Sequence, residues 1–265
     1  MDFRQKRILG RTGVEVGRLG VAGGYGAPAA ALEEAFARGC NYFYWGSFRR
    51  SGMAEAIRNL CRQGQRDKLV VVVQVYNRIA GMMAWSLERA LRKGRLEYAD
   101  VLLLGGYNSI PAKRILEAAL KLKESGKVKF LAMSGHHRPA FPKAAEKNIF
   151  DIFHIRYNAA HRGAETEVFP KLPQTGRPGL VTYTATRWGN LLKPGKTPAG
   201  EKTPRASDCY RFVLSHPAVD VGMTGPKNLE EMQEALAALD RGPLSEEEMA
   251  WMKRVGDHMH GQGWL

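Results

Sequence analysis

The strongest constraint in the sequence is an eightfold alternation of short apolar runs with longer segments whose apolar residues recur at helical spacing. Each apolar run has the length of a β-strand and is bounded by Gly, Pro or polar residues. We expect strands at residues 19–22, 41–45, 69–75, 100–104, 128–134, 151–156, 180–184 and 218–224. We expect helices at residues 28–38, 53–62, 84–93, 112–124, 139–147, 164–171, 206–215 and 228–239. The order of these elements predicts an α/β protein.

Eight strand and helix pairs in regular alternation favour a parallel sheet. No change in composition divides the chain, and 265 residues is a common length for one barrel. We therefore expect a single (β/α)8 TIM barrel domain over residues 1–265. Before the barrel, RILGRTGVEVGRLG predicts a β-hairpin that turns at Thr12-Gly13. After it, SEEEMAWMKRVGDHM predicts an extra C-terminal helix, where Ser245 and Glu248 have the spacing of a capping box.

The composition is that of a globular protein, with 44% hydrophobic and 25% charged residues. No apolar stretch approaches the roughly 18 residues that would cross a bilayer, and the start, MDFRQKRILG, has no hydrophobic signal region. The three cysteines, Cys40, Cys61 and Cys209, have neither a zinc-like nor a disulfide-like spacing. We expect a cytoplasmic protein without a membrane partner.

The chain is strongly basic, with a net charge of +14 and a pI of about 9.8. Such a charge favours anionic partners, although a solvated basic surface is the simpler interpretation. The basic residues are dispersed, and no zinc-finger, KH or RNP-like pattern is present. We expect a small-molecule substrate, for which this charge favours an anion, and no specific nucleic-acid recognition.

In a TIM barrel the chemistry lies at the carboxyl ends of the strands. Tyr44 ends the second apolar run, and His136 follows the fifth, where it could transfer protons or bind an anion as a helix begins. In DIFHIR, alternation sends His154 and Arg156 to one face, which can be the barrel interior. These four residues are our catalytic candidates, with Arg156 suited to an acidic substrate. A core histidine and a structural ion pair are the alternative interpretations of His154 and Arg156.

Several motifs together resemble those of the aldo-keto reductase superfamily, over nearly the whole chain. ILGRTGVEVGRLGVAGGYG is similar to that family's entrance hairpin, and GCNYFYW stands in the place of its GxNxFDTA. DVLLLGGY, ESGKVKFLAMSGH and HPAVDVGMTGPKNLEEMQEAL are similar to its later strands and its cofactor helix. The resemblance implies a barrel enzyme in which a nicotinamide cofactor, NAD(H) or NADP(H), exchanges hydride with a carbonyl or alcohol substrate.

The family's catalytic tetrad of Asp, Tyr, Lys and His is replaced in this chain. The Asp position corresponds to Tyr44, the Tyr position to Arg49 or Phe48, the Lys position to Gln74 and the His position to Gly105. The standard mechanism of the family is therefore not available. We expect proton transfer from a substituted group, Tyr44 or His136, and a tyrosine would need a neighbouring cation to act near neutral pH.

The resemblance also implies a set of cofactor-binding positions. Ser134 and His154 would hold the carboxamide, Thr186, Arg187 and Trp188 would cover the pyrophosphate, and Lys227 and Asn228 would lie at the adenosine 2′-phosphate. Gly24 allows close approach of the backbone at the pocket floor, and Gly225 belongs to a Gly-Pro turn before a helix start whose free N–H groups suit a phosphate. The complete expected set is Gly24, Ser134, His154, Thr186, Arg187, Trp188, Gly225, Lys227 and Asn228. An ordinary helix cap at Asn228 and a packing role for Trp188 remain open.

Two other functions remain open at this stage. The histidines could serve a non-redox isomerase, lyase or hydrolase, or the barrel could bind a nucleotide without catalysis. A metal held by His136, His154, His161 and Glu165 is chemically reasonable, but their spacing matches no recognised metal signature, so we expect no metal.

Overall fold

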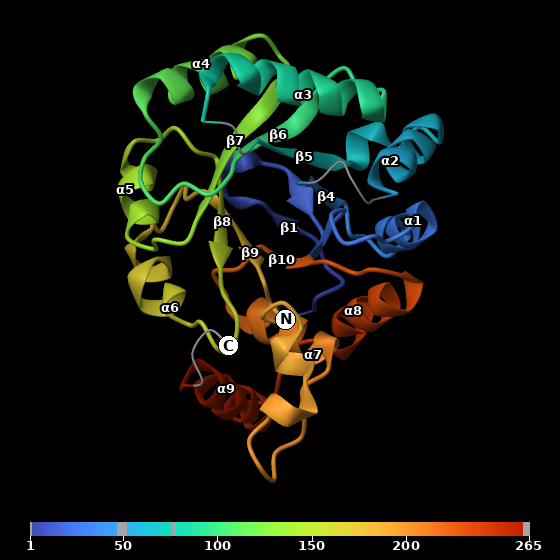
Figure 1. The fold of residues 1–265 in the computed structure, drawn as a ribbon, viewed down its shortest axis with the longest axis vertical. Helices are drawn as coiled ribbons and strands as arrows, with labels where there is room; N and C mark the ends of the chain where they lie inside the picture. Colours follow the sequence, from blue (N-terminus) through green and yellow to red (C-terminus); the bar gives the residue numbers. More distant parts are fainter. Residues whose placement is uncertain (1, 47–51, 76–77, 262–265) are drawn as a thin grey trace.

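The computed structural model describes residues 2–46, 52–75 and 78–261, which form a closed barrel of eight parallel strands (Figure 1). The strands are β3 (Leu19–Ala22), β4 (Tyr42–Trp45), β5 (Val70–Val75), β6 (Ala99–Leu104), β7 (Val128–Gly135), β8 (Ile152–Arg156), β9 (Gly179–Tyr183) and β10 (Val221–Thr224). Their order around the barrel follows the chain, and β10 pairs with β3 to close it. The predicted (β/α)8 fold is confirmed.

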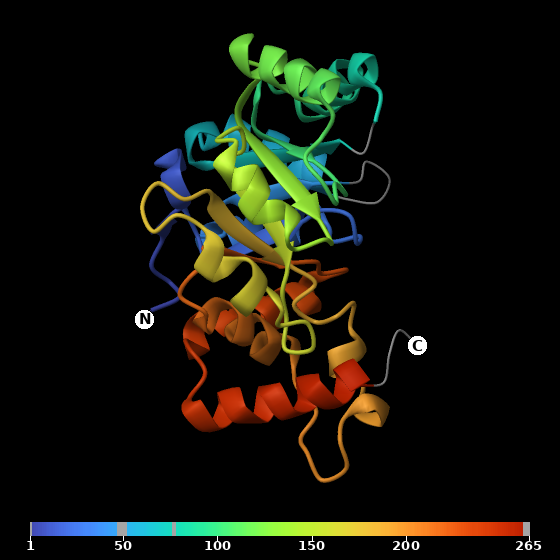
Figure 2. The same ribbon diagram turned by 90° about the vertical axis from the view of Figure 1, so that its left-hand side faces the viewer.

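The helices pack around the outside of the barrel, as Figure 1 shows. They are α1 (Ala29–Ala37), α2 (Met53–Arg62), α3 (Ala80–Gly94), α4 (Lys113–Glu124), α5 (Ala140–Glu146), α6 (Ala164–Glu167), α7 (Ala206–Ser215), α8 (Leu229–Arg241) and α9 (Glu246–Gly261). The extra helix α9 lies beside α7, at the lower end of Figure 2. Its predicted capping box is present, because Ser245 and Glu248 exchange hydrogen bonds of 2.9 and 3.1 Å. None of the described helices combines the length and the apolar character that crossing a bilayer requires.

Two predicted helices, at residues 84–93 and 164–171, differ by four residues at one end from those observed, and the other helix ends differ by two residues at most. Helix α3 begins at Ala80 rather than at residue 84, because Met83 is fully buried and packs the first turn on the barrel, although Gly81 is a poor helix former. Helix α6 ends at Glu167, and a short 3-10 turn follows at Phe169–Lys171. Pro170 lies in that turn and has no N–H with which to continue the α-helical hydrogen bonds.

The barrel interior is filled by alternate residues of the strands. Its buried apolar side chains include Tyr42, Val70, Val72, Val101, Leu103, Ala132, Ile152, Val181, Val221 and Met223. Burying each Val or Leu stabilises the fold by about 1.5–3 kcal/mol. These side chains pack the interior of the barrel, and Ala22, Leu103 and Met223 of the same cluster also line the cavity at its carboxyl end.

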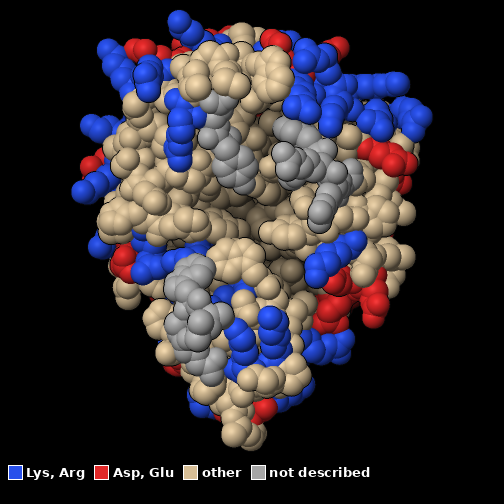
Figure 3. Space-filling model, in the orientation of Figure 1, with Lys and Arg blue, Asp and Glu red and all other residues tan. Residues whose placement is uncertain are grey.

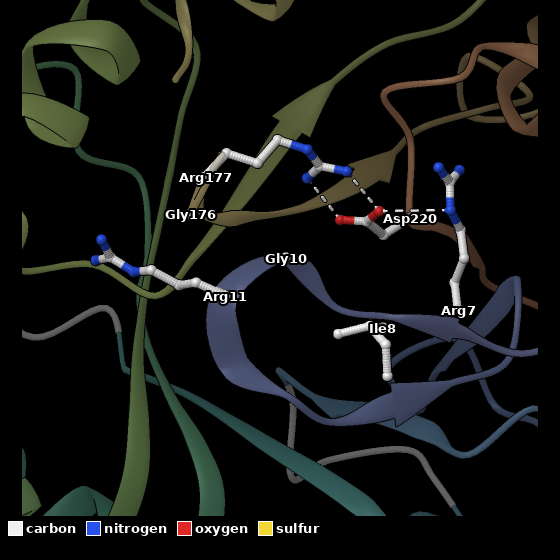
Figure 4. A pocket seen from close by; sticks show the side chains of 7 residues that line it. All are labelled: Arg7, Ile8, Gly10, Arg11, Gly176, Arg177 and Asp220. Carbon is white, nitrogen blue, oxygen red and sulfur yellow. Dashed lines mark hydrogen bonds and ion pairs between the residues drawn. The ribbon is translucent and has the colours of Figure 1, made fainter. Parts of the chain in front are cut away.

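The amino end of the barrel is covered by the predicted hairpin, β1 (Arg7–Ile8) and β2 (Glu15–Val16). Under it, buried Asp220 accepts hydrogen bonds of 2.8 and 2.7 Å from Arg177, and one of 2.8 Å from the backbone N–H of Leu180 (Figure 4). A small cavity of about 320 Å³ lies between the hairpin and this ion pair. These contacts fix the first residues of β9 and β10, so this end of the barrel is structural.

Candidate functional site

A cavity of about 1150 Å³ opens at the carboxyl ends of the strands and extends from the barrel interior to the start of α8. Figure 3 looks onto this face and shows the hollow at its centre. Residues from all eight barrel strands contribute to its wall, together with the loop between β9 and α7 and the first two turns of α8. The lining of the cavity therefore runs from His154 inside the barrel to Glu234 in α8.

Three of the replaced tetrad positions lie together at the barrel end of the cavity. The Tyr44 hydroxyl donates a hydrogen bond to Oε1 of Gln74. A Cβ added at Gly105 would lie 1.9 Å from Nε2 of Gln74, so this amide occupies the space of a side chain at position 105. Arg49 and Phe48 lie outside the described residues. A neutral hydrogen-bonded pair thus stands where the family has charged groups.

His154 lies one level deeper, fully inside the barrel as alternation predicts. Its Nε2 is 2.8 Å from the hydroxyl of Tyr42. Burial lowers the pKa of His154 to about 3 and raises the pKa of Tyr42 well above its ordinary value. Both groups are therefore neutral over the physiological pH range, and His154 is a polar member of the barrel core that also contributes to the cavity floor.

Tyr183, at the end of β9, is a cavity residue that the sequence interpretation missed. Its hydroxyl donates a 2.9 Å hydrogen bond to the carbonyl of Gly135 and lies 3.3 Å from Nδ1 of His136. Burial and the nearby charge of Arg156 lower the pKa of His136. The alternation that was used for β8, when it is applied to β9, also points Val181 and Tyr183 inward, so it could have identified Tyr183.

Arg156 and His161 lie behind the wall of the cavity rather than on it. Burial lowers the pKa of Arg156, and the charges of Arg138 and Arg187 add to the effect. Burial and these arginines also lower the pKa of His161 to about 4, and its Nδ1 lies 3.3 Å from Oδ1 of Asn158. Arg156 is not among the described residues that line the cavity, but its positive charge acts on His136 there.

No three His, Cys, Asp or Glu side chains group as a metal site would require, within residues 2–46, 52–75 and 78–261. His136 pairs with Tyr183 and His154 with Tyr42. Glu165, the carboxylate considered with them, accepts a 2.6 Å hydrogen bond from Tyr157. These side chains have separate partners.

The loop after β9 forms one side of the cavity through Thr186 and Trp188. Its backbone has positive φ angles at Thr184 (61°), Arg187 (50°) and Trp188 (53°), which L-residues seldom adopt. Arg187 is buried and donates a 2.7 Å hydrogen bond to the carbonyl of Met259, near the end of α9. This geometry does not support the expected phosphate contact of Arg187, because its guanidinium points into the protein.

The start of α8 forms the far end of the cavity. A Cβ added at Gly225 would lie 2.6 Å from the ring of Tyr25, so this glycine permits the aromatic ring to pack on the backbone. Asn228 caps α8 by accepting a 2.8 Å hydrogen bond from the N–H of Glu231. The N–H of Lys227 donates to the carboxylate of Glu231 at 2.9 Å.

At the start of the loop between β7 and α5, the backbone N–H groups that could bind an anion already have an acceptor. Oδ1 of Asn108 accepts hydrogen bonds of 2.7 and 3.1 Å from the N–H groups of His136 and His137. The hydroxyl of Ser134 accepts a 3.2 Å hydrogen bond from the N–H of Gly106. Any role of His136 toward a ligand is therefore carried by its side chain.

The expected site residues are thus largely brought together. Those that line the cavity are Tyr44, Ser134, His136, His154, Thr186, Trp188, Gly225, Lys227 and Asn228. Those outside its described lining are Gly24, in the turn beside Tyr25, and the two arginines, Arg156 and Arg187.

No protein-family model and no curated protein matches the chain. Solved structures do match it. An aldo-keto reductase from Bacillus halodurans is 19% identical in its apo and holo forms, with TM-scores of 0.75 and 0.77, and each match covers 95% of this chain and 95% or 96% of the other. An aldo/keto reductase from Klebsiella pneumoniae in complex with NADP and acetate is 24% identical, with a TM-score of 0.77 and 96% coverage of both chains. The chain therefore has the fold of the aldo-keto reductases, as its motifs predict.

Proposed function

We propose that this protein is an oxidoreductase of the aldo-keto reductase type, which binds NAD(H) or NADP(H) in extended form and acts on a carbonyl or alcohol substrate. The observation that carries this proposal is the continuous cavity of about 1150 Å³ from the barrel interior to α8. Its two ends are lined by the positions that the family resemblance assigns to the two ends of the cofactor. A similar barrel has been solved with NADP, which supports the same use of the cavity.

The residues of the cavity suit such a ligand. Ser134 and His154 present neutral polar atoms at the barrel end, where a carboxamide needs hydrogen-bonding partners. Thr186 and Trp188 flank the middle, and Trp188 offers a half-exposed aromatic face. Gly225, Lys227 and Asn228 lie at the far end. When bound, the cofactor supplies or accepts the hydride, and the protein supplies the proton.

His136 is the proton-transferring group that the geometry supports best. The Tyr183 proton is directed to the carbonyl of Gly135, so the Tyr183 oxygen accepts from Nδ1–H of His136. That tautomer leaves Nε2 as the basic nitrogen, which can take the proton of an alcohol or, once protonated, give it to a carbonyl oxygen. Tyr44 is the second candidate, although its proton is directed to Gln74. Catalysis by His154 is disfavoured, because burial lowers its pKa to about 3, which makes it a weak base without an acidic imidazolium proton near neutral pH, and its Nε2 is already paired with Tyr42.

The substrate proposed is a small molecule, and an anion in particular. The positive charge of Arg156 acts on His136 in the cavity and supports this choice. The three cysteines, two of them buried, are free thiols, which supports the proposed cytoplasmic location.

Nucleotide binding tests the proposal before any substrate is known. NADH or NADPH should raise the melting temperature and bind in calorimetry. The exchange Trp188→Ala should weaken binding by about tenfold or more, since it removes an aromatic stacking face. Trp85→Ala is the matched control, because Trp85 is equally exposed (51% against 49%) but lies on α3 outside the cavity. Failure of both nucleotides to bind would refute the proposed function.

A nucleotide-binding barrel without catalysis is the second candidate. The pairing of Tyr44 with Gln74 favours it, because Gln74 is uncharged and stands where the family has a Lys. Turnover of nucleotide with a broad panel of aldehydes, ketones and alcohols separates the two. Binding without turnover would support the silent barrel, and loss of turnover in His136→Gln would support the enzyme.

A further inference from the structure

The charged side chains of the cavity all lie at one end. Among its described lining residues these are Arg205, Lys227, Glu230, Glu231 and Glu234, at the starts of α7 and α8. Three carboxylates therefore face two cations. Figure 3 shows the acidic side chains over α8 beside the hollow, on a molecule whose net charge is +14. The acidic character is local and opposes the charge of the whole protein.

Both cations at this end already have carboxylate partners. Arg205 pairs with Glu234, which also accepts a 2.7 Å hydrogen bond from the hydroxyl of Ser207. Nζ of Lys227 lies 3.9 Å from one oxygen of Glu231, and its backbone N–H donates to the other. Burial opposes ionisation of Glu234, but the hydrogen bonds from Ser207 and Arg205 outweigh it and lower the pKa of this carboxyl. The local charge is therefore negative.

Helix α8 begins with its own acidic groups. Glu230 and Glu231 occupy the first turn, where carboxylates complement the helix dipole. Asn228 and Glu231 also take up N–H groups at this helix start. A phosphate placed here would have to displace Glu231 from Lys227 and remain near Glu230.

The two nicotinamide cofactors differ at the adenosine ribose. NADP(H) carries a 2′-phosphate with a charge of about −1.5 to −2, whereas NAD(H) has a hydroxyl that can donate a hydrogen bond to a carboxylate. The reacting ring has to lie near His136 and Tyr44 at the barrel end, so the adenosine half extends toward α8. This ribose therefore meets the acidic end of the cavity.

We propose that the cavity selects NAD(H) over NADP(H), and that Glu230 and Glu231 set this preference by repelling a 2′-phosphate and accepting from a 2′-hydroxyl. The inference rests on the proposed function, since it concerns the cofactor of the same site. It gives Lys227 a different role from the expected phosphate contact, because this lysine is held by Glu231.

Calorimetric titration with NADH and NADPH tests the preference without any substrate. The wild type should bind NADH at least about tenfold more tightly, which corresponds to about 1.4 kcal/mol. The double exchange Glu230→Gln with Glu231→Gln keeps an oxygen that can accept from the N–H of Lys227 but removes two charges. It should raise NADPH affinity by about fivefold or more and leave NADH affinity within about twofold.

Helix α9 provides the matched control, Glu246→Gln with Glu247→Gln. These are also adjacent, exposed glutamates in the first turn of a helix, but neither lines the cavity. This control should leave both affinities unchanged. Equal or tighter binding of NADPH by the wild type, or an unchanged NADPH affinity in the α8 variant, would overturn the preference alone. Failure of the wild type to bind either nucleotide would overturn the proposed function, and the preference with it.

Discussion

Replacing His154 by Gln should remove one source of acid sensitivity from the fold. His154 is fully buried beside Tyr42, and burial lowers its pKa from an ordinary value of 6.5 to about 3. In the unfolded chain the imidazole takes up a proton below its ordinary pKa, whereas in the folded protein it stays neutral until pH falls to about 3. The contribution of neutral His154 to stability is therefore complete above the ordinary pKa and is lost as pH falls through this window.

The size of the effect follows from the two pKa values. Each pH unit below the ordinary value costs the folded state about 1.4 kcal/mol, so at about pH 4 the loss relative to pH 7 is about 3 kcal/mol. The His154→Gln variant has no such titration, and its amide can still hydrogen bond with Tyr42. The difference in unfolding free energy between wild type and variant should thus change by about 3 kcal/mol between these pH values, in favour of the variant at low pH.

Urea denaturation at several pH values, followed by tryptophan fluorescence, measures this difference. Other groups that titrate cancel in the comparison, including His161, whose pKa is also lowered by burial. The same exchange at His137, which is exposed, should retain the pH dependence of the wild type. Parallel curves for wild type and His154→Gln would show that His154 is not held neutral in the core, and the exclusion of His154 as a general acid would lose its basis.

Three further predictions concern the two ends of the barrel. Gly135→Ala should lower the unfolding free energy in urea by about 1–3 kcal/mol, because its Cβ would lie 1.9 Å from the backbone oxygen of Tyr107; a loss under about 0.5 kcal/mol would contradict this close approach. Asp220→Asn should lower the unfolding free energy by about 3 kcal/mol in the same assay, because it leaves Arg177 without its buried charged partner. Asp240→Asn is the control, and it should lower the unfolding free energy by less than about 1 kcal/mol because the ion pair of Asp240 with Arg38 is exposed. Tyr183→Phe should lower turnover at least about tenfold and alter its pH profile without changing NADH affinity, and unchanged kinetics would refute the positioning of His136 by Tyr183.

The fold was predictable because the same sequence pattern, an apolar run followed by a segment of helical spacing, recurs eight times. Each strand is marked by an apolar run with a breaker at either end, and a closed parallel barrel is the natural arrangement for eight such units. The run YFYW is apolar on both faces, so periodicity could not show that Tyr42 rather than Phe43 faces His154. Only closure of the barrel brings together these residues, which are 112 positions apart.

The site was predictable where one strand end or helix start carries it, and not where distant elements meet. His136, Lys227 and Asn228 follow directly from their positions after a strand or before a helix, and all three line the cavity. Arg187 was expected at a phosphate because the family resemblance places its loop over the cofactor pyrophosphate. Its burial depends on a carbonyl acceptor in α9, and no local pattern reveals that partner.

The contact between Arg187 and Met259 joins residues 72 positions apart, and through it α9 supports the loop that lines the proposed ligand site. Figure 2 shows this helix running along the outside of the molecule, where sequence variation is ordinarily tolerated. The last turn of α9 should tolerate less variation, because the carbonyl of Met259 helps to hold the segment with positive φ angles that carries Trp188. Divergent relatives could therefore adjust ligand access through changes in a peripheral helix, with no replacement among the residues that touch the ligand.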